Sequence, residues 1–272
     1  MPDPLPIDAV LPALIDALRA ERRAVLQAPP GAGKTTRVPL ALVDAGLTEG
    51  RIVTLEPRRL AARAAAERMA ATLGEAVGET VGYRIRGETR TGHATRVEVV
   101  TEGILTRMLQ ADPALEGVGA VLFDEFHERS LNADLGLALA WEVRGALRED
   151  LILLPMSATL DAAPVAALMD DAPVITAEGR AFPVETVHLD ATLPKGARLE
   201  EAVAGLARRA LAEATGSVLV FLPGEREIRR SAALLGDLPG DVDLRPLYGA
   251  MPFAEQRAAI APGPPGRRKL VL

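Results

Sequence analysis

The sequence predicts an α/β fold, with a doubly wound parallel sheet lobe followed by a second, incomplete lobe of the same kind. Three observations predict it. Short apolar runs alternate with helical stretches, several runs are apolar on both faces, and a glycine-rich loop joins the first run to the helix after it. With 272 residues, of which 49% are apolar and 25% charged, the chain can form about two domains.

The first predicted domain covers residues 1–179. Its strands are expected at 24–27, 52–55, 97–100, 119–123, 151–156 and 174–176. Helices are expected at 34–45, 60–73 and 131–147, and Gly46 and Gly74 can end the first two. The basic segment 83–86 is expected to be a solvated edge strand. The strand–helix order predicts right-handed crossovers, and hence a parallel sheet.

The second predicted domain covers residues 180–272 and begins where the chain loses its periodicity, around 179–183. Strands are expected at 183–189, 217–222, 242–247 and 269–272, and helices at 199–214 and 225–235. Since no helix follows the last predicted strand to cover it, we expect this second lobe to be incomplete.

Composition excludes several classes of protein. No uncharged apolar run approaches the ~18 residues of a membrane span, and no basic patch precedes an apolar stretch at the N-terminus. The absence of cysteine excludes disulfides and thiol catalysis, and three scattered histidines argue against zinc, so a cytoplasmic protein is expected. The net charge of −6 means that any nucleic acid must be held by local clusters and backbone amides.

The glycine-rich loop predicts a polyphosphate site. Gly31 and Gly33 let the backbone curl so that amides point inward, Lys34 can reach β and γ oxygens, and the Thr35 hydroxyl can bind Mg²⁺. The expected nucleotide contacts are Pro30, Gly31, Ala32, Gly33, Lys34, Thr35 and Thr36. One position departs from the usual pattern, because Ala28 stands where glycine is typical. The alternative interpretation is a structural glycine turn before a helix.

A second polar group follows another buried strand. Asp124 is placed to hold Mg²⁺ and Glu125 to deprotonate an attacking water, the general-base role in phosphoryl hydrolysis. His127, three residues after Asp124, is expected to sense the phosphate and to touch a neighbouring strand end. Ser157 and Thr159 fall at another strand end. There they can couple this polar group to the rest of the protein, or they can cap the next helix.

In combination these segments resemble the DEAH/DExH-box branch of superfamily 2 helicases, and specifically its bacterial HrpB group. Residues 31–35, 124–127 and 157–159 resemble motifs I, II and III. Residues 55–62 and 101–105 resemble motifs Ia and Ib, and 220–228 and 247–249 resemble motif IV and the turn after it. Phe126, where most relatives have Ala or Cys, and residues 127–131 indicate the HrpB group.

The resemblance implies two RecA-like lobes that hydrolyse ATP (or another NTP) with Mg²⁺ and move along a single nucleic-acid strand, RNA in this family. Lys34, Glu125 and His127 would then be catalytic. The residues implied to line the nucleic-acid path are Pro57, Arg58, Arg59, Thr101, Glu102, Gly103, Gly224, Tyr248 and Gly249. Arg58 and Arg59 oppose the dipole of the helix that they begin, which favours a phosphate partner for them.

Two further functions stay open on the sequence alone. One is a nucleotide-gated RNA-binding or scaffold module that does not unwind, and the other is a duplex DNA translocase. In this family the motifs that would follow residue 272 supply arginines that stabilise the transition state. An arginine finger of this kind accelerates phosphoryl transfer by ~10³–10⁵-fold in related enzymes. We therefore expect this chain by itself to bind nucleotide, hydrolyse it slowly and unwind nothing.

Overall fold

The computed structural model describes residues 4–158, 162–179, 183–189 and 192–272. The chain divides into two compact units, Met1–Pro183 and Val184–Leu272, and each is described by itself. No helix within the described ranges is long and apolar enough to cross a membrane.

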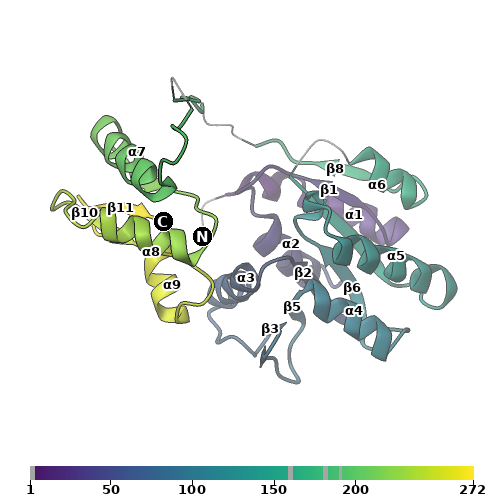
Figure 1. Cartoon of the computed structure of the whole chain (residues 1–272). Helices are drawn as coiled ribbons and strands as arrows, with labels where there is room; N and C mark the ends of the chain where they lie inside the picture. The colour runs from purple at the N-terminus through teal and green to yellow at the C-terminus, as the bar shows by residue number, and fades with distance from the viewer. Residues whose placement is uncertain (1–3, 159–161, 180–182, 190–191) are drawn as a thin grey trace. The chain divides into compact units, whose positions relative to one another are not determined.

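The first unit alternates strands and helices as a doubly wound fold does (Figure 1). Its helices are η1 (Pro6–Ala9, a 3₁₀ turn), α1 (Leu11–Glu21), α2 (Lys34–Asp44), α3 (Arg59–Leu73), α4 (Glu102–Ala111), η2 (Phe126–Glu128, a 3₁₀ turn), α5 (Leu131–Ala146) and α6 (Ala163–Leu168). Its strands are β1 (Val25–Gln27), β2 (Arg51–Glu56), β3 (Val81–Ile85), β4 (Glu88–Arg90), β5 (Val97–Thr101), β6 (Val118–Phe123), β7 (Ile152–Ser157) and β8 (Val174–Thr176).

These strands form one eight-stranded sheet in the order β4-β3-β5-β2-β6-β7-β1-β8. Every neighbouring pair is parallel except β3 and β4, which form an antiparallel hairpin. The predicted α/β class with a parallel sheet is therefore confirmed.

Both faces of this sheet are buried, because side chains alternate between two apolar cores. Leu26, Ile52 and Leu122 belong to the core beneath α1, α2 and α3, whereas their chain neighbours Val25, Val53 and Val121 belong to the core beneath α4, α5 and α6. The two-residue period of a strand produces this alternation. It explains why the strands are continuously apolar in the sequence.

The expectation of a solvated edge strand at 83–86 is wrong. β3 lies between β4 and β5, and Tyr83 is buried. The edge strand is β4, which the sequence did not predict because its three residues, Glu88–Arg90, are polar. Tyr83 donates a hydrogen bond to Glu88, and Arg63 of α3 pairs with the same carboxylate, which explains how these polar groups are accommodated beside the core.

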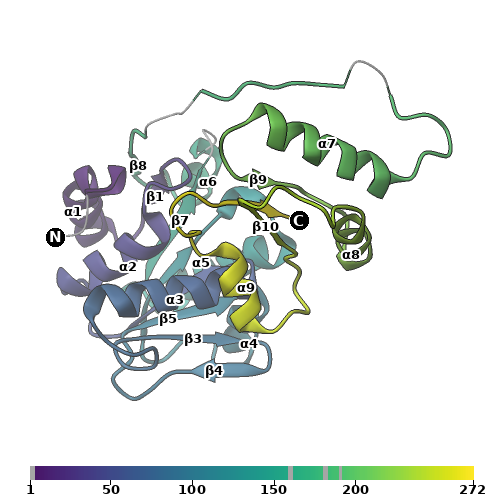
Figure 2. The same cartoon turned by 90° about the vertical axis from the view of Figure 1, so that its left-hand side faces the viewer.

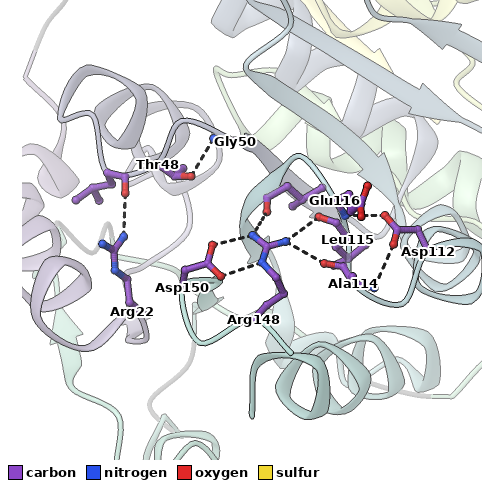
Figure 3. A network of polar contacts seen from close by, with 11 residues as sticks. Arg22, Thr48, Gly50, Asp112, Ala114, Leu115, Glu116, Arg148 and Asp150 are labelled. Carbon is purple, nitrogen blue, oxygen red and sulfur yellow. Dashed lines mark hydrogen bonds and ion pairs between the residues drawn. The ribbon is translucent and has the colours of Figure 1, made fainter. Parts of the chain in front are cut away.

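A polar network ties together the loops at the N-terminal ends of the strands (Figure 3). The Arg148 guanidinium donates to the backbone oxygens of Ala114 (2.9 Å), Leu115 (3.1 Å) and Val118 (2.9 Å). It also holds both carboxylate oxygens of Asp150, each at 2.8 Å. One side chain thus satisfies carbonyls that a loop would otherwise expose to water.

The second unit is smaller and has its own core. Its elements are α7 (Leu199–Glu213), β9 (Val218–Leu219), α8 (Glu225–Leu234), β10 (Val242–Arg245), α9 (Phe253–Ile260) and β11 (Arg268–Val271) (Figure 2). The strands form a parallel sheet in the order β10-β11-β9. Leu211, Ile228 and Leu270 are among the buried residues that join α7 and α8 to this sheet.

Two strand predictions in this unit need correction. Residues 183–189 form no strand, and Val184 (87% exposed) and Val187 (71%) have no sheet to pack on. A strand without a neighbour is not stable, whatever its composition. The strand expected at 217–222 is limited to Val218–Leu219. The sequence also gave no sign of α9, which lies between two loops rich in proline and glycine.

Candidate functional site

The sheet brings the predicted nucleotide residues to one edge. β6, β7 and β1 are consecutive in the sheet and parallel, so the loops that follow them leave from the same side. The loops after β6 and β1 carry Asp124 and the glycine-rich segment, and Ser157 is the last residue of β7. The amide of Ala28 also donates to the carbonyl of Ser157 at 3.0 Å, which joins the bases of two of them. In open α/β sheets ligands bind at this carboxyl edge.

Backbone conformation explains both glycines of the loop. Gly31 has φ +76° and Gly33 has φ +98°, a region that strongly favours glycine. Gly33 is also crowded, since a Cβ there would come within 2.7 Å of Leu5 Cδ1 and 3.1 Å of Ile7 Cγ2. Ala28 is not among the positive-φ residues of the described chain, and its methyl group is buried in the core. Alanine in place of glycine at position 28 therefore introduces no backbone strain.

The loop presents a set of unused hydrogen-bond donors. Among the described residues, the backbone amides of Gly31, Gly33, Lys34 and Thr35 have no acceptor. Three of them begin α2, where the helix dipole adds positive potential. Lys34 is buried, 4% exposed, and its Nζ donates to the Ala28 carbonyl at 2.9 Å. An anion with several oxygens would satisfy all of these donors.

The predicted magnesium ligands are in contact. The Thr35 hydroxyl donates to Oδ2 of Asp124, although 89 positions separate the two residues. The other oxygen, Oδ1, accepts from the Glu125 amide at 2.8 Å. Asp124 is 3% exposed, so both of its carboxylate oxygens are held in a fixed position. Hydroxyl and carboxylate oxygens are the ligands that Mg²⁺ prefers.

A carboxyl group that the sequence did not single out lies beside this pair. Glu56 ends β2 and is 4% exposed, and the Asp124 amide donates to the preceding carbonyl, that of Leu55, at 3.0 Å. Burial, and then the charge and hydrogen bond of Asp124, raise the pKa of Glu56 to about 9. Glu56 therefore carries a proton at neutral pH. The signal available in the sequence was an acidic residue directly before Pro57 at the end of an apolar strand.

The predicted general base occupies a strained position. Glu125 has φ +49°, which is uncommon outside glycine and is found at functional sites. Its Oε2 lies 3.4 Å from Nδ1 of His127. The same Nδ1 accepts a hydrogen bond from the Ala158 amide at 3.3 Å. His127 thus contacts the strand end that follows β7, as predicted. Thr159 lies outside the described residues.

The residues implied to line the nucleic-acid path fall into two groups. In the first unit Arg58 is the N-cap of α3 and Arg59 is its first residue, and both are exposed. Thr101 is the N-cap of α4, Glu102 is its first residue, and the next residue, Gly103, is exposed. Pro57 directly precedes this arginine pair. In the second unit Gly224 caps α8, while Tyr248 and Gly249 follow β10. The Tyr248 hydroxyl accepts from Arg229 at 2.6 Å. Each group is located within its own unit.

The arrangement fits a magnesium-bound polyphosphate. The amides, Lys34 and the helix N-terminus supply positive charge, while Thr35 and Asp124 supply two oxygen ligands. Within the described chain no cluster of three or more His, Asp or Glu side chains could hold a metal ion without help. This pattern suits Mg²⁺, which keeps several waters and is typically held by one or two protein oxygens together with phosphate.

Comparison with known proteins agrees with this geometry. The sequence profile of DEAD/DEAH box helicases matches residues 9–168, more than half of the chain. The chain belongs to the DEAD/DEAH box helicase family. The resemblance inferred from the motifs is therefore confirmed.

The similar proteins named here are about three to four times as long as this chain. The chain is 52% identical over 269 residues to the ATP-dependent RNA helicase HrpB of Escherichia coli (strain K12), covering 98% of this chain and 33% of that protein. It is 34% identical over 279 residues to the pre-mRNA-splicing factor ATP-dependent RNA helicase prp22 of Schizosaccharomyces pombe, covering 98% and 24%. The crystal structure of the Escherichia coli DEAH/RHA helicase HrpB matches with a TM-score of 0.92 at 52% identity, covering 98% of this chain and 34% of that one. The chain spans about a third of HrpB.

Proposed function

We propose that this chain forms the nucleotide-binding part of an ATP-dependent RNA helicase of the HrpB group. The contact between Thr35 and Asp124 carries the proposal, because it brings a P-loop hydroxyl and a strand-end carboxylate together at the mouth of the donor-rich loop. The similarity to two helicases whose names specify ATP and RNA supports the choice of nucleotide and substrate. A sequence without cysteine requires no oxidising compartment, which supports a cytoplasmic location.

The residues take the following roles in this proposal. The backbone amides of Gly31, Gly33, Lys34 and Thr35 and the Lys34 ammonium bind the phosphates, while Pro30, Ala32 and Thr36 shape the loop around them. Thr35 and Asp124 would hold Mg²⁺, which when bound neutralises charge on the β and γ phosphates. Glu125 accepts a proton from the attacking water. His127, the third catalytic residue, lies beside this carboxylate, with Nδ1 3.4 Å from Oε2 and bonded to the Ala158 amide. Ser157 and Thr159 couple this centre to the nucleic-acid residues of the first unit, which are Pro57, Arg58, Arg59, Thr101, Glu102 and Gly103. In the second unit Gly224, Tyr248 and Gly249 are the residues proposed to contact nucleic acid.

Nucleotide binding tests the first part of the proposal. A fluorescent ATP analogue titrated with Mg²⁺ should bind the wild-type chain, and Lys34→Ala should weaken binding at least tenfold, because it removes a charge-assisted contact to phosphate. Lys195→Ala, which removes an exposed lysine of the second unit, is the matched control and should bind normally. Equal binding by the Lys34→Ala and Lys195→Ala variants would contradict the assignment of the loop.

Two other functions are separated by further measurements. A scaffold or nucleotide-gated RNA clamp would keep its biological activity in the Glu125→Gln variant, whereas a helicase would lose that activity together with hydrolysis. A duplex DNA translocase would bind DNA more tightly than single-stranded RNA in the presence of nucleotide. The RNA helicase proposal requires the opposite preference.

A further inference from the structure

The turn between β6 and α5, residues Glu125–Ser130, has an unusually fixed shape. It contains the 3₁₀ turn η2, and the residues that flank this turn, Glu125 and Arg129, both have φ +49°. Phe126 is 5% exposed and packs edge to face on Phe123, with ring centroids 6.1 Å apart. The Arg129 guanidinium lies over the Phe126 ring at 5.9 Å. A segment held in this way transmits a displacement at one end to the other.

The outer side of this turn contacts both nucleic-acid segments of the first unit. Nη2 of Arg58 donates to Oε1 of Glu128 at 2.7 Å. The Ser130 hydroxyl donates to Oε1 of Glu102 at 2.6 Å and accepts from the Ala133 amide, capping α5. The predicted path residues Arg58 and Glu102 are thus each bonded to a side chain of the same turn.

The inner side of the turn is the predicted general base itself. The amide of Glu128 donates to the carbonyl of Glu125 at 2.9 Å, so a single 3₁₀ turn separates the Arg58 partner from the catalytic carboxylate. Arg58 is 72% exposed and only one of its N–H groups is engaged by Glu128. The guanidinium has five donors in a planar fork, so it can bind a phosphate while it keeps its bond to Glu128.

We propose that Glu128 is a positioning residue that couples nucleic-acid binding at Arg58 to the nucleotide site at Glu125. A phosphate of single-stranded RNA bound to Arg58 fixes the guanidinium, the guanidinium fixes the Glu128 carboxylate, and the 3₁₀ turn carries this constraint to Glu125. The inference rests on the proposed function, because it needs a chain that binds both RNA and nucleotide. It adds a residue, Glu128, that contacts neither ligand.

Coupling of this kind is measured as a ratio of affinities. The dissociation constant of a fluorescein-labelled oligouridine is determined by anisotropy for the 272-residue chain, with and without Mg²⁺ and a non-hydrolysable ATP analogue. Coupling factors between two sites are typically about 5–150-fold. By linkage, RNA must change the affinity for the analogue by the same factor, which provides an internal check.

Substitution of Glu128 should remove the coupling. In Glu128→Ala the ratio should fall to within about twofold of one, because Arg58 then has no link to the turn. Glu128→Gln keeps an oxygen acceptor for Arg58 and should retain most of the coupling, a rescue that a general loss of stability would not give. The double variant Arg58→Ala/Glu128→Ala should lose no coupling beyond what Arg58→Ala alone loses, because both substitutions break the same chain of contacts. Glu67→Ala, on the same helix as Arg59, is the matched control and should behave as wild type.

The outcomes separate the inference from the proposed function. Wild-type coupling in Glu128→Ala, with both ligands bound, would overturn the inference and leave the helicase proposal intact. A wild-type chain that binds both ligands without coupling would do the same. A wild-type chain that binds neither ligand would refute the proposed function, and the inference with it. If Glu128→Ala fails to fold, Glu128→Met gives the same test, because its side chain has a similar length but no carboxylate to accept the hydrogen bond from Arg58.

Discussion

Replacing Glu56 by Gln should make the protein more stable at alkaline pH. The folded chain keeps the proton on this buried carboxyl group until about pH 9, whereas the unfolded chain releases it near the ordinary value of 4.5. Between these values the folded state binds more protons than the unfolded state, so the free energy of unfolding falls as pH rises. An amide has no proton to lose in this range, and it can still donate a hydrogen bond to Asp124.

The size of this stabilisation follows from the width of the pH range in which Glu56 is protonated in the folded chain and ionised in the unfolded chain. Each pH unit within it is worth up to about 1.4 kcal/mol, so the three units from pH 5 to pH 8 give an upper limit of about 4 kcal/mol. For a unit of this size 1 kcal/mol shifts the melting temperature by about 2–4 °C. The melting temperature of Glu56→Gln relative to wild type should therefore rise between pH 5 and pH 8 by at most about 8–16 °C.

The assay is thermal unfolding followed by circular dichroism at several pH values, in a chelator and without nucleotide. Titrating groups remote from Glu56 affect both proteins equally, so the difference between variant and wild type isolates Glu56 and its interaction with the neighbouring acids, Asp124 above all. A difference that stays constant from pH 5 to pH 8 would refute the reasoning, because it would mean that Glu56 is ionised in the folded state throughout this range. Glu67→Gln serves as the control and should track wild type.

Two other predictions concern named contacts. Gly31→Ala and Gly33→Ala both place a side chain at positive φ, at a cost of about 1–2 kcal/mol, but only Gly33→Ala also brings a Cβ within 2.7 Å of Leu5. Gly33→Ala should therefore melt at a clearly lower temperature than Gly31→Ala, and equal melting temperatures would contradict the crowding. Arg148→Met should lower the free energy of unfolding by about 2–4 kcal/mol, because it leaves the carbonyls of Ala114, Leu115 and Val118 without their donor. Urea unfolding measures this loss, and a change below about 0.5 kcal/mol would show that water replaces the guanidinium.

The parallel sheet could be predicted because its signals are local. Continuous apolar strands, helix-ending glycines and strand-end acids are visible in any short window, and the strands from Val25 to Thr176 were found within one or two residues of their ends. The edge strand β4 and the exposed segment 183–189 could not be predicted in this way. Whether a short polar or apolar run pairs depends on which neighbour the rest of the fold places beside it.

The candidate site, too, could be predicted from the sequence only in part. The sequence predicted which residues surround the glycine-rich loop, because motif spacing reports residue type. It could not give Glu56 a role, since a carboxyl group of high pKa requires burial next to a second carboxyl group, and both depend on the pairing of β2 with β6. Nor could it assign Glu128, whose proposed role depends on its contact with Arg58, the N-cap of α3.

The bond between Lys34 and the Ala28 carbonyl has a consequence for affinity. The ammonium group has three donors and this bond uses one of them, so a phosphate can bind to the other two while the carbonyl keeps its partner. The side chain is thus held inside the loop before an anion arrives, and binding does not have to immobilise a freely rotating lysine. Much of the entropy of ordering this side chain is therefore lost on folding instead of on association.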